Sequence, residues 1–451
     1  MTPNCRTATI VAALALTLAA ARPLPAAAVP GADAPAVTAA DRALADEMDA
    51  YLVRHVLAPR FPACVDREHG GFHANFATDW TKQPDQRRFI VYQARNTWNA
   101  ATVALARKAL REEYLGYTRH GVAFLRDRMW DREHGGFFDA VRLDGSPDPA
   151  GDGTKMTYGQ AFGVYALAVA HRATGDPAAL DLARRAYEWV EAHCREQGRP
   201  GYVSGVRRDG SPIPVDLEAV APGREVAGMG VPAVYRDMNT SIHLLEAWTE
   251  LLKEWPDPGL RASTRRLFEL VRDSFYSEPG TLHLFLDPSG HPVAGPSSFG
   301  HDVETGFLLL EAAEALGVPE DPKAHRVARR LVDHALVLGW NPDTGQLYEE
   351  GFAMRPAFDR SLQWWAQFEM VNALSLMDAL HGRETPRYRE ALRKAWAFTR
   401  ERLTDEAHGG VYGGVDAEGR VVPTKSNDWF AGYHTSRALL LTSARLRGGG
   451  R

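Results

Sequence analysis

Six glycine-bearing turns recur along this chain at nearly equal intervals, and they constrain its fold more than any other feature. Successive turn glycines are separated by 65, 65, 79, 65 and 65 residues. The segment DREHGGF stands at 66–72 and again at 131–137, and weaker versions of it surround the other four glycines. Aromatic and β-branched residues alternate around these positions, which predicts a short β-hairpin at each turn. The turn glycines are Gly71, Gly136, Gly201, Gly280, Gly345 and Gly410.

Each interval between turns contains two stretches of helical length and periodicity, such as 154–174 followed by 177–196. A single helix pair cannot bury its own apolar face, so successive pairs must stack on one another. The last repeat has one helix, 427–447, and the segment 41–62 near the start of the chain supplies its missing partner. The sequence therefore predicts an all-α fold in which six helix pairs close into a ring, as one domain over residues 41–447.

Composition and charge are those of an ordinary globular protein. The chain is 45% hydrophobic and 24% charged, with a formal net charge of −5 and a pI of about 6.4. These values give no basic surface for nucleic acid or for an acidic membrane, so neither is an expected partner. Small neutral substrates remain open.

The N-terminal residues resemble an export signal rather than part of the fold. Arg6 ends a short positive segment, an apolar run covers 8–20, and the small residues 26–28 suit a signal peptidase. Residues 1–28 are therefore predicted to be a signal peptide, and 29–40 a disordered lead-in. The alternative is an uncleaved anchor, for which the apolar run is short. We expect a secreted or periplasmic protein with no stable membrane insertion after cleavage.

Two cysteines remain once the predicted signal peptide, with Cys5, is removed. Cys64 and Cys194 could form one disulfide in an oxidising compartment, and the sequence does not decide whether they pair. No C-x-x-C spacing for a metal is present.

The repeat also predicts where the active site lies. Counting 24 residues on from a turn glycine reaches Arg95, Gln160, Glu304, Glu369 and His434, which are polar residues in otherwise apolar helices. We expect these side chains to point to a common place inside the ring. The third repeat carries extra residues in the loop 211–236, and its matching helix, which begins at Asn239, brings His243 and Glu246.

Histidine and glutamate stand three residues apart in two of these helices, as His301 with Glu304 and His243 with Glu246. Residues at this spacing share a helix face, and the carboxylate can hold the imidazole in one tautomer and raise its basicity. A lone helix histidine is more often a core or surface residue, but the shared register favours function here. Other polar and aromatic residues at the same level are Tyr158, Trp364, Trp365, Gln367 and Trp429.

The paired tryptophans and the turn histidines are interpreted mainly as structural residues. Tryptophans in a helix usually pack, and one of Trp364 and Trp365 is a candidate platform on which a sugar could stack. His69, His134 and His408 belong to the glycine turns and are interpreted as turn residues.

Five motifs follow one another along the chain: QARNTW at 93–98, NTSIHLLEA at 239–247, FGHDVETGFLLLEAAEALG at 299–317, QWWAQFE at 363–369 and YHTSRAL at 433–439. Together they resemble the N-acylglucosamine 2-epimerase superfamily, most of all its cellobiose 2-epimerase branch. The resemblance implies an (α/α)6 barrel of six helix pairs with short hairpins between repeats. It also implies interconversion of sugars at C2 with no metal and no nucleotide cofactor.

The resemblance implies a role for each matching residue. His301 and His434 match the acid/base histidines, Arg95 the arginine that contacts the enediolate, and His243 a histidine that helps to open the sugar ring. The implied substrate-binding residues are Asn239, Glu304, Glu369, Tyr158, Trp365 and Trp429. Members of the family often read W-K-x-P-Y-H before the last histidine, whereas this chain reads WFAGYH at 429–434. Ser361, Leu362 and Gln363 precede the WW pair here, where the cellobiose branch tends to have lysine. Because of these two differences, the motifs do not decide whether the substrate is a disaccharide.

The chemistry can be argued from the residues themselves. A proton at C2 of an aldose becomes removable only beside a free C1 carbonyl, and Arg95 can stabilise the oxyanion that develops. Two histidines can then move the proton from one face of C2 to the other. Return of the proton to C1 instead gives a ketose, so an aldose-ketose (mannose) isomerase is an alternative with the same residues.

Two rivals belong to other classes. A secreted (α/α)6 glycoside hydrolase could use Glu304 and Glu369 as its pair of carboxylates, although the neighbouring histidine and tryptophan motifs do not serve hydrolysis. A catalytically silent sugar-binding protein is the third interpretation. The preferred sugar stays open among cellobiose, mannobiose, mannose and N-acetylglucosamine, and we expect a monomer or a weak homodimer.

Overall fold

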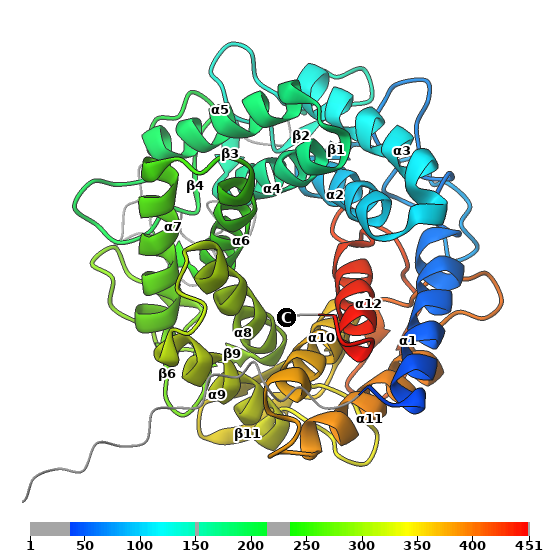
Figure 1. Cartoon of the computed structure of the whole chain (residues 1–451). Coiled ribbons are helices and arrows are strands. Elements are labelled where there is room, and N and C mark those ends of the chain that lie inside the picture. Colours follow the sequence, from blue (N-terminus) through cyan, green and yellow to red (C-terminus); the bar gives the residue numbers. More distant parts are fainter. Residues whose placement is uncertain (1–36, 149–152, 214–234, 450–451) are drawn as a thin grey trace, which may run out of the picture. The chain divides into compact units, whose positions relative to one another are not determined.

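The structure is a computed structural model that describes residues 37–148, 153–213 and 235–449. The predicted signal peptide, most of the predicted lead-in and residues 214–234 of the loop 211–236 lie outside these residues. Within them, twelve α-helices alternate between an inner and an outer ring (Figure 1). The inner helices are α2 (Ile90–Ala106), α4 (Thr157–Thr174), α6 (Met238–Glu254), α8 (Phe299–Ala315), α10 (Trp364–His381) and α12 (Tyr433–Leu446). The outer helices are α1 (Ala39–Tyr51), α3 (Arg111–Phe124), α5 (Pro177–His193), α7 (Pro258–Leu270), α9 (Pro322–Leu338) and α11 (Arg387–Arg402).

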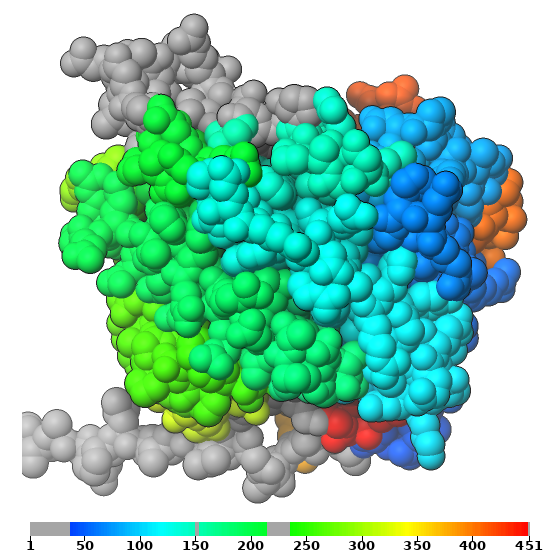
Figure 2. Space-filling view, turned by 90° about the horizontal axis from the view of Figure 1, so that it is seen from above, coloured from blue at the N-terminus to red at the C-terminus, as the bar shows by residue number. Residues whose placement is uncertain are grey.

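The inner and outer helices differ in how much of their surface is buried. Inner helices are buried almost all round, because each packs against two inner neighbours and an outer helix. Outer helices bury one face only and form a continuous wall when the ring is seen from the side (Figure 2). The ring closes where α12 packs against α2 and α1, the helix from the start of the chain. The predicted (α/α)6 barrel is confirmed.

Short strands tie each repeat to the next. The strand before an inner helix pairs, antiparallel, with a strand that follows the next turn, as β1 (Arg88–Phe89) does with β2 (Ala140–Val141). The same pattern joins β3 (Thr154–Met156) to β4 (Gly205–Arg207) and β5 (Arg236–Asp237) to β8 (Phe285–Leu286). It also joins β9 (Ser297–Ser298) to β10 (Glu350–Phe352) and β12 (Leu362–Gln363) to β13 (Gly414–Val415). The remaining strands are β6 (Tyr276–Ser277), β7 (Thr281–Leu282), β11 (Arg355–Asp359) and β14 (Val421–Val422).

The six turn glycines all have positive φ, which side chains with a Cβ rarely adopt. Antiparallel bridges close the hairpins around five of them, for example between Val65 and Phe72 and between Trp130 and Phe137. At Gly201 the backbone N–H of Val203 donates to the carbonyl of Cys194.

A buried ion pair clamps three of the turns to the strand or loop that leads into the next inner helix. In the second repeat, Lys155 Nζ lies 3.0 Å from Asp131 Oδ2, and Arg208 reaches the same carboxylate at 2.8 Å. Asp66 with Arg88 and Asp405 with Lys425 repeat the arrangement in the first and last repeats.

Several predicted boundaries move for identifiable reasons. Helix α1 begins at Ala39, two residues before the predicted start, because Thr38 and Asp41 form a capping box. Helix α12 begins at Tyr433 rather than at 427, since Asn427 accepts backbone hydrogen bonds from Trp429 and Phe430 in a turn.

Cys64 and Cys194 do not form a disulfide in this structure, since both are buried as free thiols. No helix among the described residues has the length and apolar character needed to cross a membrane.

Candidate active site

The candidate site gathers at the N-terminal ends of the inner helices. The sixth residue of α2 is Arg95, of α6 His243, of α8 Glu304 and of α10 Glu369. His434 joins them from the first turn of α12. Contacts described below connect these five side chains, so Arg95, Glu304, Glu369 and His434 lie together as their distance from the turn glycines predicts, and His243 joins them.

Gln160 was assigned to the same set, and that prediction is wrong. Its amide oxygen accepts from the backbone N–H of Phe137 at 2.7 Å, and its amide nitrogen donates to the carbonyl of Phe137 at 2.8 Å. Gln93 makes the same pair of bonds to Phe72. Helix α4 begins two residues later after its turn glycine than α2, α8 and α10 do, so Phe162 takes the position counted for Gln160.

Gln367 and Trp364 also serve the fold rather than the site. Gln367 accepts from the backbone N–H of Leu347 and donates to the carbonyl of Gly345, much as Gln160 bonds the turn of its own repeat. Trp364 is stacked on Phe430, with ring centroids 3.6 Å apart and an interplanar angle of 19°. Phe430 belongs to the segment WFAGYH, in which this chain differs from the pattern common in the family. The differing segment therefore supplies the ring that covers Trp364. Trp365 is therefore the tryptophan of the pair that faces the histidines.

His434 and His301 both contact the Trp365 ring, whose centroid lies 5.4 Å from that of His434 and 4.6 Å from that of His301. His434 Nδ1 lies 2.8 Å from Glu369 Oε1 and 3.8 Å from Glu304 Oε1. His301 Nδ1 lies 2.9 Å from Ser298 Oγ, on the strand β9 that leads into α8. Each imidazole is thus held through Nδ1, which leaves Nε2 for a ligand.

His243 occupies the other side of the group. Its Nδ1 lies 2.9 Å from Glu246 Oε2, as the spacing of three residues predicts, and its ring packs edge-on against Tyr158. Asn239 lies one turn earlier on α6, and its side-chain oxygen is buried without a hydrogen-bond partner among the described residues. An amide oxygen in that position can accept a hydrogen bond from a sugar hydroxyl.

Arg95 is held by an aromatic cage. Its guanidinium carbon lies 4.4 Å from the centroid of Phe162 and 5.1 Å from that of Tyr433. Nη2 donates to the Tyr158 hydroxyl at 2.8 Å, and Nη1 donates to the carbonyl of Trp429 at 3.0 Å. Trp429 is 37% exposed, and its ring centroid lies 6.0 Å from that of Tyr158. A permanent positive charge therefore lies beside an exposed aromatic ring.

Burial sets the protonation of the histidines. It lowers the pKa of His301 to about 4, although the nearby Glu304 opposes the change, and it lowers the pKa of His434 well below its usual value. Both imidazoles are therefore neutral at pH 7. Burial also raises the pKa of Glu369, even though Arg437 opposes the shift.

Sequence reasoning missed four residues of the site: Ser298, Phe162, Tyr433 and Arg437. Tyr433 and Arg437 stand in the YHTSR motif on either side of His434, and the Tyr433 hydroxyl donates to Glu246 at 2.6 Å. Arg437 donates to Glu246, Glu304 and Glu369. The signal that could have found Arg437 is its position three residues, or about one helical turn, after His434.

The side chains of Glu304, Glu369 and His434 hold ligand atoms within 4.8 Å of one another, as a metal site requires. Arg437 Nη2 already donates to Oε1 of both carboxylates. The guanidinium therefore supplies the positive charge at the point where a cation would bind.

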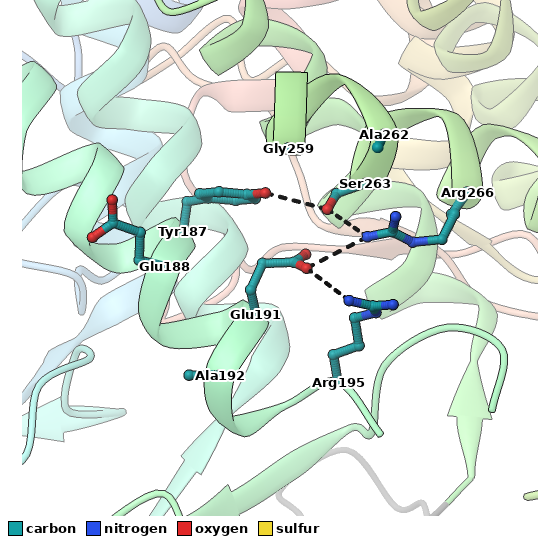
Figure 3. Close-up of a pocket in the computed structure, with 9 residues that line it drawn as sticks. All are labelled: Tyr187, Glu188, Glu191, Ala192, Arg195, Gly259, Ala262, Ser263 and Arg266. Atoms are coloured by element: carbon teal, nitrogen blue, oxygen red, sulfur yellow. Dashed lines mark hydrogen bonds and ion pairs between the residues drawn. The ribbon is translucent and has the colours of Figure 1, made fainter. Parts of the chain in front are cut away.

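A separate groove of about 490 Å³ lies on the outer wall between α5 and α7, and its side chains pair with one another (Figure 3). Glu191 is bridged by Arg195 and Arg266, each at 3.5 Å, and the Ser263 hydroxyl lies 3.2 Å from that of Tyr187. None of the candidate catalytic residues lines this groove.

The chain is similar in sequence and fold to known sugar epimerases. A family model described as N-acylglucosamine 2-epimerase (GlcNAc 2-epimerase) matches residues 70–215 and 223–438. A cellobiose 2-epimerase of Bacteroides fragilis is 29% identical over 412 residues, which cover 88% of this chain and 98% of that protein. The solved cellobiose 2-epimerase of Spirochaeta thermophila is also 29% identical, with a TM-score of 0.79 and coverage of 92% of this chain and 99% of that one. A solved D-mannose isomerase shares the fold, with a TM-score of 0.73 and 22% identity. The match covers 88% of this chain and 97% of that one.

Proposed function

The chain belongs to the N-acylglucosamine 2-epimerase family, as its motifs predicted, and on that premise we propose that it epimerises a sugar at C2 without a metal or nucleotide cofactor. Its relatives make it an epimerase, an enzyme of the isomerase class. The observation that carries the proposal is the placement of two neutral histidines, His301 and His434, against one tryptophan ring. Arg95 supplies a permanent positive charge in the same group of contacts.

The reaction begins with opening of the sugar ring, which moves a proton from the O1 hydroxyl to the ring oxygen and frees the C1 carbonyl. We assign this step to His243, whose Nδ1 is held by Glu246 so that Nε2 can take and return the proton. Asn239, one turn away, is suited to hold a sugar hydroxyl during the step.

Proton transfer at C2 follows. One histidine takes the C2 proton, and the charge moves onto O1 of the enediolate, where Arg95 stabilises it. The enediolate then turns and the other histidine returns a proton to the opposite face. The accepting histidine must be neutral, which the low pKa values of His301 and His434 favour. The donating histidine is neutral in the free site and takes up a proton from solvent during the reaction, and the negative charge that develops on the enediolate favours its protonated form.

The proposed substrate is an aldose or the reducing-end glucose or mannose unit of a disaccharide. Relatives named cellobiose 2-epimerase support the disaccharide. The exposed Trp429 ring offers a surface on which an apolar sugar face can stack. An aldose-ketose isomerase remains the second candidate, because the same groups can return the proton to C1.

The hydrolase interpretation conflicts with the position of its two carboxylates. Glu304 and Glu369 are 1% and 0% exposed, and both accept hydrogen bonds from the same guanidinium, that of Arg437. A hydrolase needs its carboxylates on opposite sides of the scissile bond, in contact with the substrate. These two instead lie behind His434.

Product analysis tests the proposal. The purified protein is incubated separately with glucose, mannose, cellobiose and N-acetylglucosamine, and the products are resolved by chromatography. A C2 epimer of at least one sugar is the expected result. A ketose identifies the isomerase, shorter glycans identify a hydrolase, and unchanged sugars in all four reactions contradict the proposal.

We also propose, from the sequence of residues 1–28, that the protein is secreted or periplasmic. When the full chain is expressed in a bacterial host, intact-mass analysis of the protein recovered outside the cytoplasm should give an N-terminus near residue 29. Recovery from the cytoplasm alone, with the first 28 residues present, contradicts export.

A further inference from the structure

Arg437 contacts three buried carboxylates at once. Its Nη1 donates to Glu246, while Nη2 donates to Glu304 and, at 2.6 Å, to Glu369. The Arg437 side chain is 3% exposed, and the three carboxylates are no more than 2% exposed. Buried charges are unfavourable unless paired, and three carboxylates around one guanidinium leave two negative charges in excess. The arrangement is therefore not explained by packing alone.

Two of these carboxylates hold candidate catalytic histidines. Glu246 Oε2 lies 2.9 Å from His243 Nδ1, and Glu369 Oε1 lies 2.8 Å from His434 Nδ1. An ionised carboxylate can only accept hydrogen bonds, so each Nδ1 must carry a proton. The neutral imidazole then has its free lone pair on Nε2, which is the form that a general base requires.

We propose that Arg437 is a positioning residue that binds Glu246, Glu304 and Glu369 together and so holds His243 and His434 as Nδ1-protonated tautomers with Nε2 free for the substrate. The inference rests on the proposed function for what Nε2 does. The tautomers follow from the contacts, and they can be measured without any sugar.

Loss of Arg437 affects Glu369 most. Burial already raises the pKa of Glu369 while Arg437 opposes it, whereas Arg437 and His243 together bring the pKa of Glu246, which burial would raise, down to about 2. Without the guanidinium, the pKa of Glu369 rises further, and a protonated Glu369 can donate to His434 Nδ1. His434 then carries its proton on Nε2 and is no longer a base.

The charged and titratable groups that form this cluster or face it come from every inner helix. They are Arg95 on α2, Tyr165 on α4, His243 and Glu246 on α6, His301, Glu304 and Glu311 on α8, Glu369 on α10, and Tyr433, His434 and Arg445 on α12.

Nitrogen NMR of the imidazoles tests the inference directly. Protein labelled with ¹⁵N-histidine is recorded at pH 7.5 without sugar, and the signals of His243 and His434 are assigned from their Asn variants. The wild type should show a protonated Nδ1 and an unprotonated Nε2 for both. Arg437→Gln should move His434 to the Nε2-protonated form. A folded Arg437→Gln protein with both tautomers unchanged overturns the inference.

Kinetics supply a second readout that a purely structural role does not move. Arg437→Gln should lower kcat at pH 7 by about 100-fold or more while KM changes little, because a general base is lost. Its activity should recover as pH rises and Glu369 ionises, so the acid limb of the profile lies at least about one pH unit above that of the wild type. A profile parallel to that of the wild type contradicts the role.

Arg60→Gln is the matched control. Arg60 is also a buried arginine, but it donates to the hydroxyls of Tyr92 and Ser426 and lies outside the carboxylate cluster. Its loss should leave the tautomers and the pH profile unchanged even where the melting temperature falls. Arg437→Lys keeps the positive charge but loses the two-pronged guanidinium that donates through Nη1 and Nη2, so it should give an intermediate kcat and a mixture of His434 tautomers. Wild-type values in Arg437→Lys also overturn the inference. If the wild type shows the expected tautomers but converts no sugar, the proposed function fails while the positioning role stands.

Discussion

At the scale of single residues, the account depends on two histidines that burial keeps neutral. His301 and His434 sit in different surroundings, since His301 is held by a serine hydroxyl and His434 by a carboxylate. Glu304 favours the protonated form of both imidazoles, and burial outweighs it in each case. Both histidines are required, because the two faces of C2 need separate groups.

Replacement of either histidine tests this requirement. His301→Asn and His434→Asn should each lower the epimerisation rate by about 10²–10⁴-fold, the usual cost of losing a general base. Binding of the sugar, measured by calorimetry, should change little. Turnover above about a tenth of the wild-type rate in either variant contradicts the assigned role.

His334→Asn provides the matched control. His334 is also buried, but it lies on the outer helix α9, where Nε2 bonds the carbonyl of Ala353. Its replacement should leave turnover unchanged, which separates the loss of a base from the loss of a packed imidazole.

At the scale of elements, the site depends on how closely α8 approaches α10. A Cβ on Gly300 would lie 2.6 Å from Trp365 Cη2 and 2.7 Å from the Cβ of Ala366, well inside normal contact distances. The absence of a side chain at Gly300 therefore lets Trp365 rest against the two histidines.

Gly300→Ala should push the Trp365 ring away from His301 and reduce kcat by about tenfold or more, since a displacement of about 1 Å at an active site has a large effect on rate. A Cβ on Gly116 of α3 would meet no described atom within 4 Å, so Gly116→Ala should keep full activity and raise stability by about 0.5–1 kcal/mol. Thermal melting and steady-state kinetics of both variants give the comparison. Equal kcat values in the two variants would show that the close approach does not position the site.

The elements also show how far the sequence alone could lead. The turn-to-helix spacing located Arg95, Glu304 and Glu369 because α2, α8 and α10 begin at the same distance from their turn glycines. It also reached His434, although α12 begins four residues later after its turn glycine and carries His434 in its first turn. It failed at Gln160 because α4 begins two residues later. Side chains that cross the ring, such as Arg437 to Glu246, belong to no single repeat. Contacts of this kind form only when the barrel closes. The repeat period predicts that the barrel closes, but it does not predict which side chains then meet across the ring.

At the scale of the whole molecule, the clamped turns hold the ring of helices together. Burial works to raise the pKa of Asp131, but hydrogen bonds from Arg208 and Lys155 outweigh it and lower the pKa to about 2. The pKa of Asp405, clamped by Lys425, also lies well below its usual range. A depressed carboxyl pKa stabilises the folded state above the unfolded pKa, and this contribution is lost as pH falls through the folded value.

We therefore expect the melting temperature to fall between about pH 4 and pH 2, with Asp131 contributing about 2 kcal/mol of the loss. Asp131→Asn should remove this part of the dependence and destabilise the protein by about 3–5 kcal/mol at pH 7, because it leaves Lys155 buried without its partner. Asp127→Asn, a change at a 43% exposed residue nearby, should alter stability by less than about 0.5 kcal/mol. Identical melting curves for the two variants would contradict the clamp.

The central claim is that the protein transfers a proton at C2 of a sugar, and deuterium incorporation tests it most directly. A substrate aldose, chosen from the sugars that the enzyme converts, is incubated with the enzyme in D₂O, and the product is analysed by NMR. A histidine that has taken the C2 proton can exchange it with solvent, and the second histidine delivers a solvent-derived deuteron to the other face. The account predicts deuterium at C2 of the epimeric product. Epimer formed without deuterium at C2 would contradict the two-histidine mechanism, and deuterium at C1 of a ketose would identify the enzyme as an isomerase.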